Sequence, residues 1–273
     1  MNKRIIKQII VALVFFLILF TIGFLVYYFN RPQPNCFDGV KNQGEEEIDC
    51  GGPCQPCELI HIKEIEVLSA KAILNQNNFY DVYAQIKNPN QNYGSGKVLY
   101  EFKLYDLQNN VVAQHSGSTF ILPGQTKYLV QTKIESPEQI NAVNLFFGSV
   151  EWEKPAKYQV PEFIIKQKEY RLLDGEDAGY SQAKGVLVNK NDFDFGKIDI
   201  DVLLFNSSYQ LVGLNAIEIR TLLAGEEREF AAFWFNKIAG QAAFMEVEAE
   251  TNIFDASNYL PAERGEAEEF QEY

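Results

Sequence analysis

Two hydrophobic patterns divide the chain. The run from Ile9 to Phe29 has no charged residue, whereas apolar and polar residues alternate in short stretches after position 59. A continuous apolar run of about 20 residues predicts a helix that crosses the roughly 30 Å hydrocarbon layer of a bilayer. Alternation predicts strands with one buried face. We therefore expect an all-β chain with an N-terminal transmembrane helix.

The apolar run is expected to stay as a membrane anchor. A buried core helix would need a helix-rich domain around it, and no such pattern follows. A cleaved signal peptide has a shorter apolar region of about 7 to 15 residues that ends at small residues, whereas Tyr27, Tyr28 and Phe29 close this run. The predicted organisation begins with a cytoplasmic segment, 1–8, and a single-pass helix, 9–29.

The charges around the run predict its orientation. Lys3, Arg4 and Lys7 precede it, and Arg31 alone follows closely. The positive-inside rule then places the N-terminus in the cytoplasm and the bulk of the chain outside the cytoplasmic membrane. The formal net charge of −13 disfavours nucleic acid as a partner and favours a neutral or cationic one.

All 4 cysteines lie in the predicted neck, 30–58. They are Cys36, Cys50, Cys54 and Cys57. An even number of cysteines in an exported segment predicts disulfides, here two of unspecified connectivity. A zinc site of four thiolates, or one in which His61 replaces one of them, is the rival interpretation. Calcium is another, but the spacing of the acidic residues matches no EF-hand loop, so we expect them to be solvated. We predict no metal and no cofactor.

The same segment resembles a short cysteine motif of exported bacterial proteins, C-x-D-G-x-x-N-x-x-E-x-x-x-D-C-G-G-x-C. The matching positions are Cys36, Asp38, Gly39, Asn42, Glu45, Asp49, Cys50, Gly51, Gly52 and Cys54. The motif recurs in surface proteins without one attached activity. The resemblance therefore implies a location outside the cell membrane more than a function.

The remaining chain repeats itself at a spacing of about 100 residues, the size of one immunoglobulin-like sandwich. Residues 97–106 and 197–206 alternate in the same phase. The expected inward-facing residues are Val98, Tyr100, Phe102 and Leu104 in the first copy, and Ile198, Ile200, Val202 and Leu204 in the second. Segments 84–88 and 122–126 likewise match 185–189 and 223–227.

These matches predict two tandem immunoglobulin-like β-sandwiches, 59–155 and 156–255, with a proline-stiffened join near 154–162. The last segment, 256–273, is rich in glutamate and has few apolar residues. We predict that it is a disordered acidic tail.

The first copy resembles two families of small sandwich domains. Residues 102–106, Phe-Lys-Leu-Tyr-Asp, fit the F-x-L-Y-D signature of the bacterial domain named after it. Residues 88–90, Asn-Pro-Asn, resemble the N-P-N element of the late-embryogenesis-abundant, water-stress type. The second copy departs from both signatures. The resemblance implies an immunoglobulin-like accessory or binding module of the cell envelope, with no catalytic residues to transfer.

No catalytic signature is found in the sequence, so we predict that the protein is not an enzyme. The 2 histidines, His61 and His115, lie in different segments and neither adjoins a plausible nucleophile. Asp199 and Asp201 could form a catalytic pair of carboxylates, but alternation places both on the predicted solvent face of a strand.

Two equivalent loops, 88–96 and 189–196, carry the candidate binding residues Tyr93, Phe193 and Phe195. Loops at the end of a sandwich often carry recognition. The alternative is that these rings close the open end of each sandwich. We expect a binding or scaffolding subunit with an envelope protein as partner. A mechanical spacer, or an enzyme with a site between the modules, are the alternatives.

Overall fold

The computed structural model describes residues 3–30, 35–76, 78–155, 160–173 and 179–260. The chain forms two compact units, Met1–Ile62 and Lys63–Tyr273. The predicted join between the sandwiches lies partly outside the described residues, as do residues 261–273 of the predicted tail.

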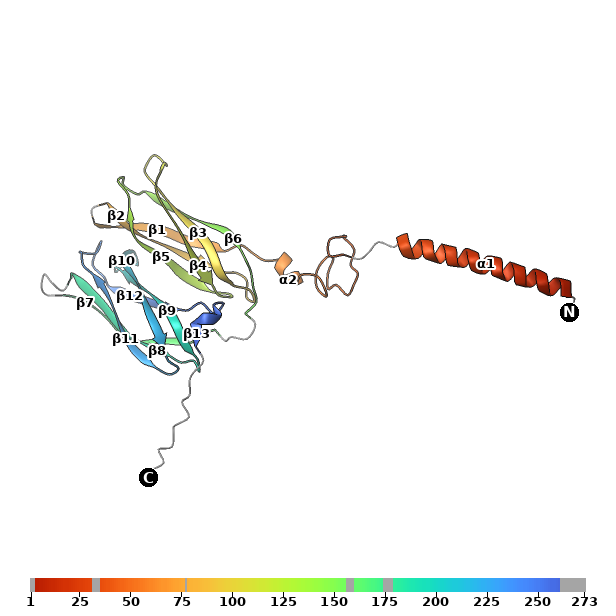
Figure 1. Ribbon diagram of the computed structural model, residues 1–273. Helices are drawn as coiled ribbons and strands as arrows, with labels where there is room; N and C mark the ends of the chain where they lie inside the picture. The colour runs from red at the N-terminus through yellow and green to blue at the C-terminus, as the bar shows by residue number, and fades with distance from the viewer. Residues whose placement is uncertain (1–2, 31–34, 77, 156–159, 174–178, 261–273) are drawn as a thin grey trace, which may run out of the picture. The chain divides into compact units, whose positions relative to one another are not determined.

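The first unit begins with helix α1 (Lys3–Asn30) (Figure 1). It starts before the predicted residue 9, because Lys3 to Gln8 continue the helix. The stretch Arg4–Phe29 is long and apolar enough to cross a membrane, and its apolar side chains are exposed. This helix is consistent with a membrane anchor or a signal sequence.

The neck of the first unit contains the short helix α2 (Cys57–Ile60) and two disulfides. The prediction of two disulfides is confirmed, and the pairs are Cys36–Cys54 and Cys50–Cys57. All four sulfurs are therefore bonded in pairs and are not free thiolate ligands.

Acidic side chains of the neck are engaged in its turns. Asp38 accepts a hydrogen bond from the Val40 amide at 2.9 Å, and Asp49 accepts one from the Gly39 amide at 3.0 Å. The buried Glu45 accepts hydrogen bonds from the amides of Asn42 and Asp49. These carboxylates cap backbone groups that a small segment without an apolar core leaves unpaired.

The second unit contains two β-sandwiches, each with two antiparallel sheets (Figure 1). The first has sheet orders β1-β2-β5 and β4-β3-β6, and the second has β7-β8-β11 and β10-β9-β12. The strands of the first are β1 (Glu66–Gln76), β2 (Phe79–Lys87), β3 (Ser95–Tyr105), β4 (Val111–Ile121), β5 (Thr126–Glu135) and β6 (Ala142–Val150). Those of the second are β7 (Phe163–Leu172), β8 (Ser181–Asn189), β9 (Asp194–Phe205), β10 (Leu211–Leu222), β11 (Glu227–Trp234) and β12 (Phe244–Glu250).

The predicted strand register is confirmed in both sandwiches. Phe102 on β3 and Val202 on β9 are each 0% exposed, and the other predicted inward residues of these strands are also buried. Each set lies in the core of its own sandwich. Alternation therefore identified the buried face of both central strands.

The two sandwiches also share a buried asparagine network. Asn88 donates to the carbonyls of Tyr93 and Leu122, and its side-chain oxygen accepts from the Asn90 amide at 3.0 Å. In the second sandwich Asn189 and Asn191 repeat this arrangement, also at 3.0 Å. Asn189 donates to the carbonyls of Phe193 and Leu223. The shared element is thus Asn-x-Asn, whatever residue stands between the two asparagines.

Part of the predicted acidic tail is ordered. Residues 256–258 form a 3₁₀ helix, η2 (Ala256–Asn258), and β13 (Tyr259–Leu260) pairs with β9. Asn258 is buried and its side chain accepts a hydrogen bond from the Lys197 amide at 2.6 Å. The predicted start of the tail at residue 256 is therefore wrong, because polar Asn258 and aromatic Tyr259 complete the second sandwich.

Candidate functional site

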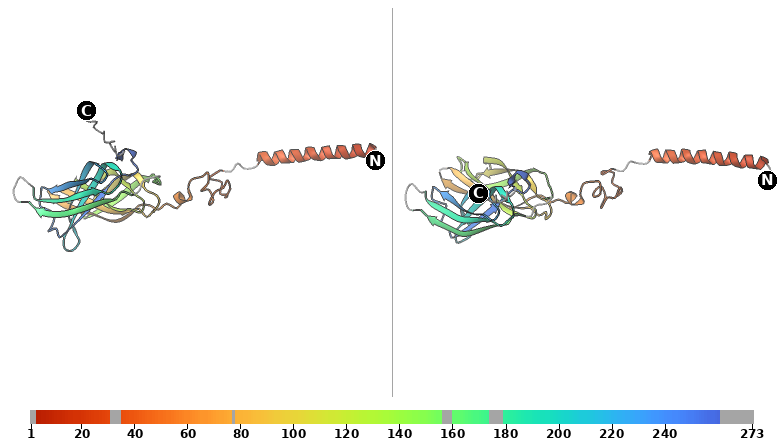
Figure 2. Two further views of the ribbon diagram at one scale, coloured as in Figure 1. Left: turned by 90° about the horizontal axis from the view of Figure 1, so that it is seen from below. Right: turned by 60° about the horizontal axis from the view of Figure 1, so that its bottom comes forward.

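The two sandwiches pack against each other within the second unit, and Figure 2 shows their strands side by side from two further directions. One end of this interface is apolar. Phe120 and Leu122 of the first sandwich cluster with Ile253 of the second, and Phe254 and Tyr259 pack against them. This apolar cluster joins segments that are far apart in the sequence.

Two glycines at the start of β3 allow Phe254 to approach the backbone. A Cβ at Gly94 would lie 2.7 Å from Cζ of Phe254, and one at Gly96 would lie 2.6 Å from its Cβ. Asn252 also donates a hydrogen bond to the Gly96 carbonyl at 3.0 Å. The first sandwich thus has a glycine surface that fits the C-terminal segment of the second.

Polar contacts continue the interface along β5 and β12. Lys127 is buried and forms an ion pair with Glu250, which also accepts from Gln125 Nε2 at 3.0 Å. The Tyr128 amide donates to Glu248 at 3.1 Å. These contacts and the apolar cluster place the two sandwiches in one defined arrangement.

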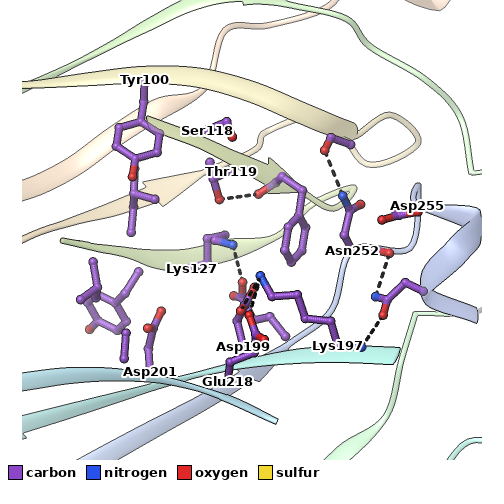
Figure 3. A pocket seen from close by; sticks show the side chains of 18 of the residues that line it. Tyr100, Ser118, Thr119, Lys127, Lys197, Asp199, Asp201, Glu218, Asn252 and Asp255 are labelled. Carbon is purple, nitrogen blue, oxygen red and sulfur yellow. Dashed lines mark hydrogen bonds and ion pairs between the residues drawn. The ribbon is translucent and has the colours of Figure 1, made fainter. Parts of the chain in front are cut away.

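A cavity of about 500 Å³ opens between the sandwiches (Figure 3). It is lined from β3, β4 and β5 on one side and from β9, β10 and β12 on the other, and it is the candidate functional site. We call it the cleft. Its charged lining residues are Lys127, Lys197, Asp199, Asp201, Glu218, Glu250 and Asp255. Its volume falls within the range of roughly 300 to 1,000 Å³ that is usual for small-molecule sites.

Most of these charges are neutralised within the protein. Lys197 pairs with Asp199 at 3.1 Å and with Glu218 at 3.2 Å, and Lys127 pairs with Glu250. Asp201, by contrast, has no hydrogen-bond or ion-pair partner among the described residues. The cleft therefore holds a half-buried carboxylate without an ion-pair partner.

The surroundings of Asp201 disfavour its ionised form. Burial, and next the charge of Glu250, raise the pKa of Asp201 to about 7, although Lys127 acts in the opposite direction. Burial raises the pKa of Glu248 to about 7 as well. Burial and the neighbouring Glu246 raise the pKa of Tyr128 to about 12. Too few positive charges face the cleft to balance its carboxylates.

The strand register explains this excess of negative charge. β12 pairs with β9 so that Glu248 lies directly opposite Asp201, and Glu250 lies opposite Asp199. Like charges opposite each other on neighbouring strands are destabilising. The alternating sequence Glu-Val-Glu-Ala-Glu of 246–250 puts all its glutamates on this one face.

The prediction that Asp199 and Asp201 lie on a solvent face holds for Asp199, whose side chain is 43% exposed, but not for Asp201, which is half-buried. The same face of β9 includes Leu203, which is 0% exposed, and Asp201 lines the cleft. Alternation identified the face correctly, but it could not reveal that a second sandwich covers it.

The predicted binding aromatics lie outside the cleft lining. Tyr93 and Phe195 are 5% and 1% exposed, and Phe195 packs on Phe163 and Tyr259. Phe193 is 44% exposed, and its ring contacts Tyr259 edge-on. The arrangement of Tyr93 and Phe195 is that of rings that close the ends of the sandwiches.

The other candidate residues are dispersed. His61 lies 3.4 Å from Glu47 in the neck, and His115 is half-buried on β4. Among the described residues, the groups with metal-ligand spacing all include disulfide-bonded cysteines. Sequence reasoning missed the cleft, although one signal was available: Glu101 and Lys103 in the first copy correspond to Asp201 and Leu203 in the second.

Comparison with known proteins identifies no relative, since no family model and no curated protein matches the chain. The functional interpretation therefore depends on the geometry and charge of the cleft.

Proposed function

We propose that the chain is a membrane-anchored binding subunit of the cell envelope, with its N-terminus in the cytoplasm and the two sandwiches outside. In this proposal the sandwiches are tandem immunoglobulin-like repeats that form one binding unit. The cleft between them is the ligand site. The partner or ligand is a component of the cell envelope, and the chain performs no catalytic step.

The observation that carries the proposal is the half-buried Asp201 in the cleft, which has no ion-pair partner among the described residues. A half-buried carboxylate without an ion-pair partner is costly, and the opposed Glu248 adds to that cost. A mechanical spacer needs two packed cores and a stable contact between the sandwiches. The apolar cluster already supplies that contact. Groups that violate local stability rules are concentrated at functional sites, so we favour a ligand site over a spacer.

The proposed repeat is supported by shared detail. Both sandwiches have the same strand order. Asp106 and Asn206 also start equivalent turns, each accepting a hydrogen bond from the amide four residues later, at 2.8 and 2.9 Å. The proposed orientation is supported by the positive charges before the apolar run.

Site-specific photo-cross-linking in the native membrane tests the binding function. A photoreactive residue at Ser118, which lines the cleft, should yield a cross-linked adduct that is absent without illumination. The matched control is the exposed Glu229 on β11. Equal labelling at both positions, or none at Ser118, would favour the spacer.

Protease accessibility tests the orientation separately. Protease added to cells stripped of their wall should digest the sandwiches, while the segment before the helix stays protected. Protection of the sandwiches would overturn the proposed location without changing the geometry of the cleft.

A further inference from the structure

We propose that the cleft binds a primary alkylammonium group beside Asp201, carried either by a free polyamine or by a lysine side chain of a partner. This inference rests on the proposed function, because it names the ligand class of the same cleft.

The charge balance of the cleft favours a cation, because two lysines face five acidic side chains in its lining. Asp201 lies among the carboxylates of Asp199, Glu248 and Glu250, and Lys127 is the nearby cation that opposes them. Lys127 is already paired with Glu250. An added ammonium group would supply the ion-pair partner that no described residue offers to Asp201.

The cleft already holds one ammonium group, that of Lys127. Its Nζ lies 4.1 Å from the centre of the Phe120 ring while it pairs with Glu250. A cation over an aromatic face and next to a carboxylate is a stable arrangement. Tyr100 and Tyr128 also line the cleft, so further aromatic surface is available for the alkyl chain of a ligand.

The first sandwich has a lysine partner for the acidic residue that corresponds to Asp201, and the second sandwich lacks it. On β3, Lys103 pairs with Glu101 at 3.2 Å. At the corresponding positions of β9, Asp201 remains acidic but Leu203 replaces the lysine. The acidic residue on β3 therefore has a lysine partner on its own strand, whereas Asp201, which faces the cleft on β9, has none.

The spacing of the carboxylates favours an organic cation over a metal ion. A hard metal ion needs several oxygen ligands that converge on one point. Among the described residues, no three acidic or histidine side chains in the cleft bring ligand atoms within 4.8 Å of one another. Separated carboxylates suit a ligand whose charges are themselves separated along a chain.

Binding should depend on pH because the ligand favours the ionised carboxylate. The charged and titratable groups that face Asp201 are those of Asp199 on β9, Glu248 and Glu250 on β12, and Lys127 and Tyr128 on β5. Glu218 lies opposite Asp199 on β10, and it is paired with Lys197. Affinity for the cation should therefore rise between pH 6 and pH 8, as Asp201 and Glu248 ionise.

Isothermal titration of the full chain in detergent tests the inference at pH 8. The probes are spermidine and a short peptide with one central lysine, and they distinguish the free from the peptide-borne source. Asp201→Asn should weaken binding of the preferred probe about tenfold or more, since a charge-assisted contact is lost. The matched control, Glu101→Gln, removes the equivalent carboxylate outside the cleft and should leave the affinity within about twofold.

A second variant keeps Asp201 and places a cation of the chain itself beside it. Ala216 is exposed, lines the cleft and lies directly opposite Asp201 on β10. Ala216→Lys should place an ammonium group beside Asp201 and abolish binding of both probes, with the melting temperature maintained.

Two results would overturn the inference. One is no binding of either probe to the wild-type chain, and the other is equal weakening by Asp201→Asn and Glu101→Gln, which indicates unspecific attraction to an acidic protein. If either occurs while Ser118 still cross-links a ligand, the ligand is of another class and the proposed function stands.

Discussion

The two sandwiches have equivalent interiors and different outer faces. Phe102 and Val202 occupy the same core position, and Asn88 and Asn189 make the same network. The outer face of β3 is partly exposed, with Leu99 at 49%, whereas that of β9 lines the cleft. The periodicity of the strands thus determines the core of each sandwich. The residues on the outer faces determine how the two sandwiches pack together.

The strongest test of equivalence is to damage both cores in the same way. Phe102→Asp and Val202→Asp should each destabilise their sandwich by more than about 4 kcal/mol, because each buries a carboxylate without a partner. Urea unfolding followed by circular dichroism measures the loss. Lys103→Glu, on the outer face of β3, should cost less than about 1 kcal/mol. A similar cost for Lys103→Glu would contradict the assigned register.

The shared asparagine network predicts a matched, somewhat smaller effect. Asn88→Ala and Asn189→Ala should each cost about 2 to 3 kcal/mol, because several buried backbone groups lose their partners at once. Thermal unfolding of the two variants provides the measurement. A cost confined to Asn88→Ala would show that the network supports only the first sandwich.

Gly96 near the start of β3 and Gly196 near the start of β9 should behave differently, although both strands are central in their sheets. A Cβ at Gly96 would lie 2.6 Å from Cβ of Phe254, whereas the nearest atom to a Cβ at Gly196 is 3.4 Å away. Gly96→Ala should therefore cost about 2 kcal/mol and loosen the interface, while Gly196→Ala should cost less than about 1 kcal/mol. Limited proteolysis and melting temperature check this pair. Equal costs would show that Phe254 adjusts easily.

The smallest expected effect is a change in pH dependence. Burial and the neighbouring carboxylates raise the pKa of Asp201 to about 7 in the folded chain. The contribution of Asp201 to the free energy of unfolding is therefore most favourable below its unfolded pKa of about 4, and it is lost as the pH rises through about 7. Asp201→Asn should flatten this decline and stabilise the chain by about 1 kcal/mol at pH 8. Urea unfolding at several pH values tests this, with Glu101→Gln as the control. An unchanged pH profile of Asp201→Asn would mean that Asp201 is solvated.

The fold was predictable where the signal is local. The apolar run of 9–29, the alternation of 97–106 and 197–206 and the cysteine spacing each reflect contacts between residues that are close in sequence or on adjacent strands. The inward residues and the two disulfides followed from these patterns. The connectivity of the disulfides did not, since several pairings satisfy the same spacing.

The cleft was not predictable because it depends on how one sandwich covers another. Alternation distinguishes the two faces of a strand but does not say which outer face meets a neighbour. Asp201 therefore seemed solvated. The same limit applies to Asn258 and Tyr259, whose polar and acidic surroundings suggested disorder although both contribute to the second sandwich.

The disulfides of the neck have a mechanical consequence for any tension between the apolar helix and the sandwiches. Because Cys36 is joined to Cys54, with their Cα atoms 5.5 Å apart, tension passes through that bridge and bypasses the residues between them. From Cys36 to Cys57 the extended path is then about 16 Å, against about 70 Å for the same residues without cross-links. Between Cys36 and Cys57 the bridges thus limit the length of the tether, and their reduction would lengthen its extended path by about 50 Å.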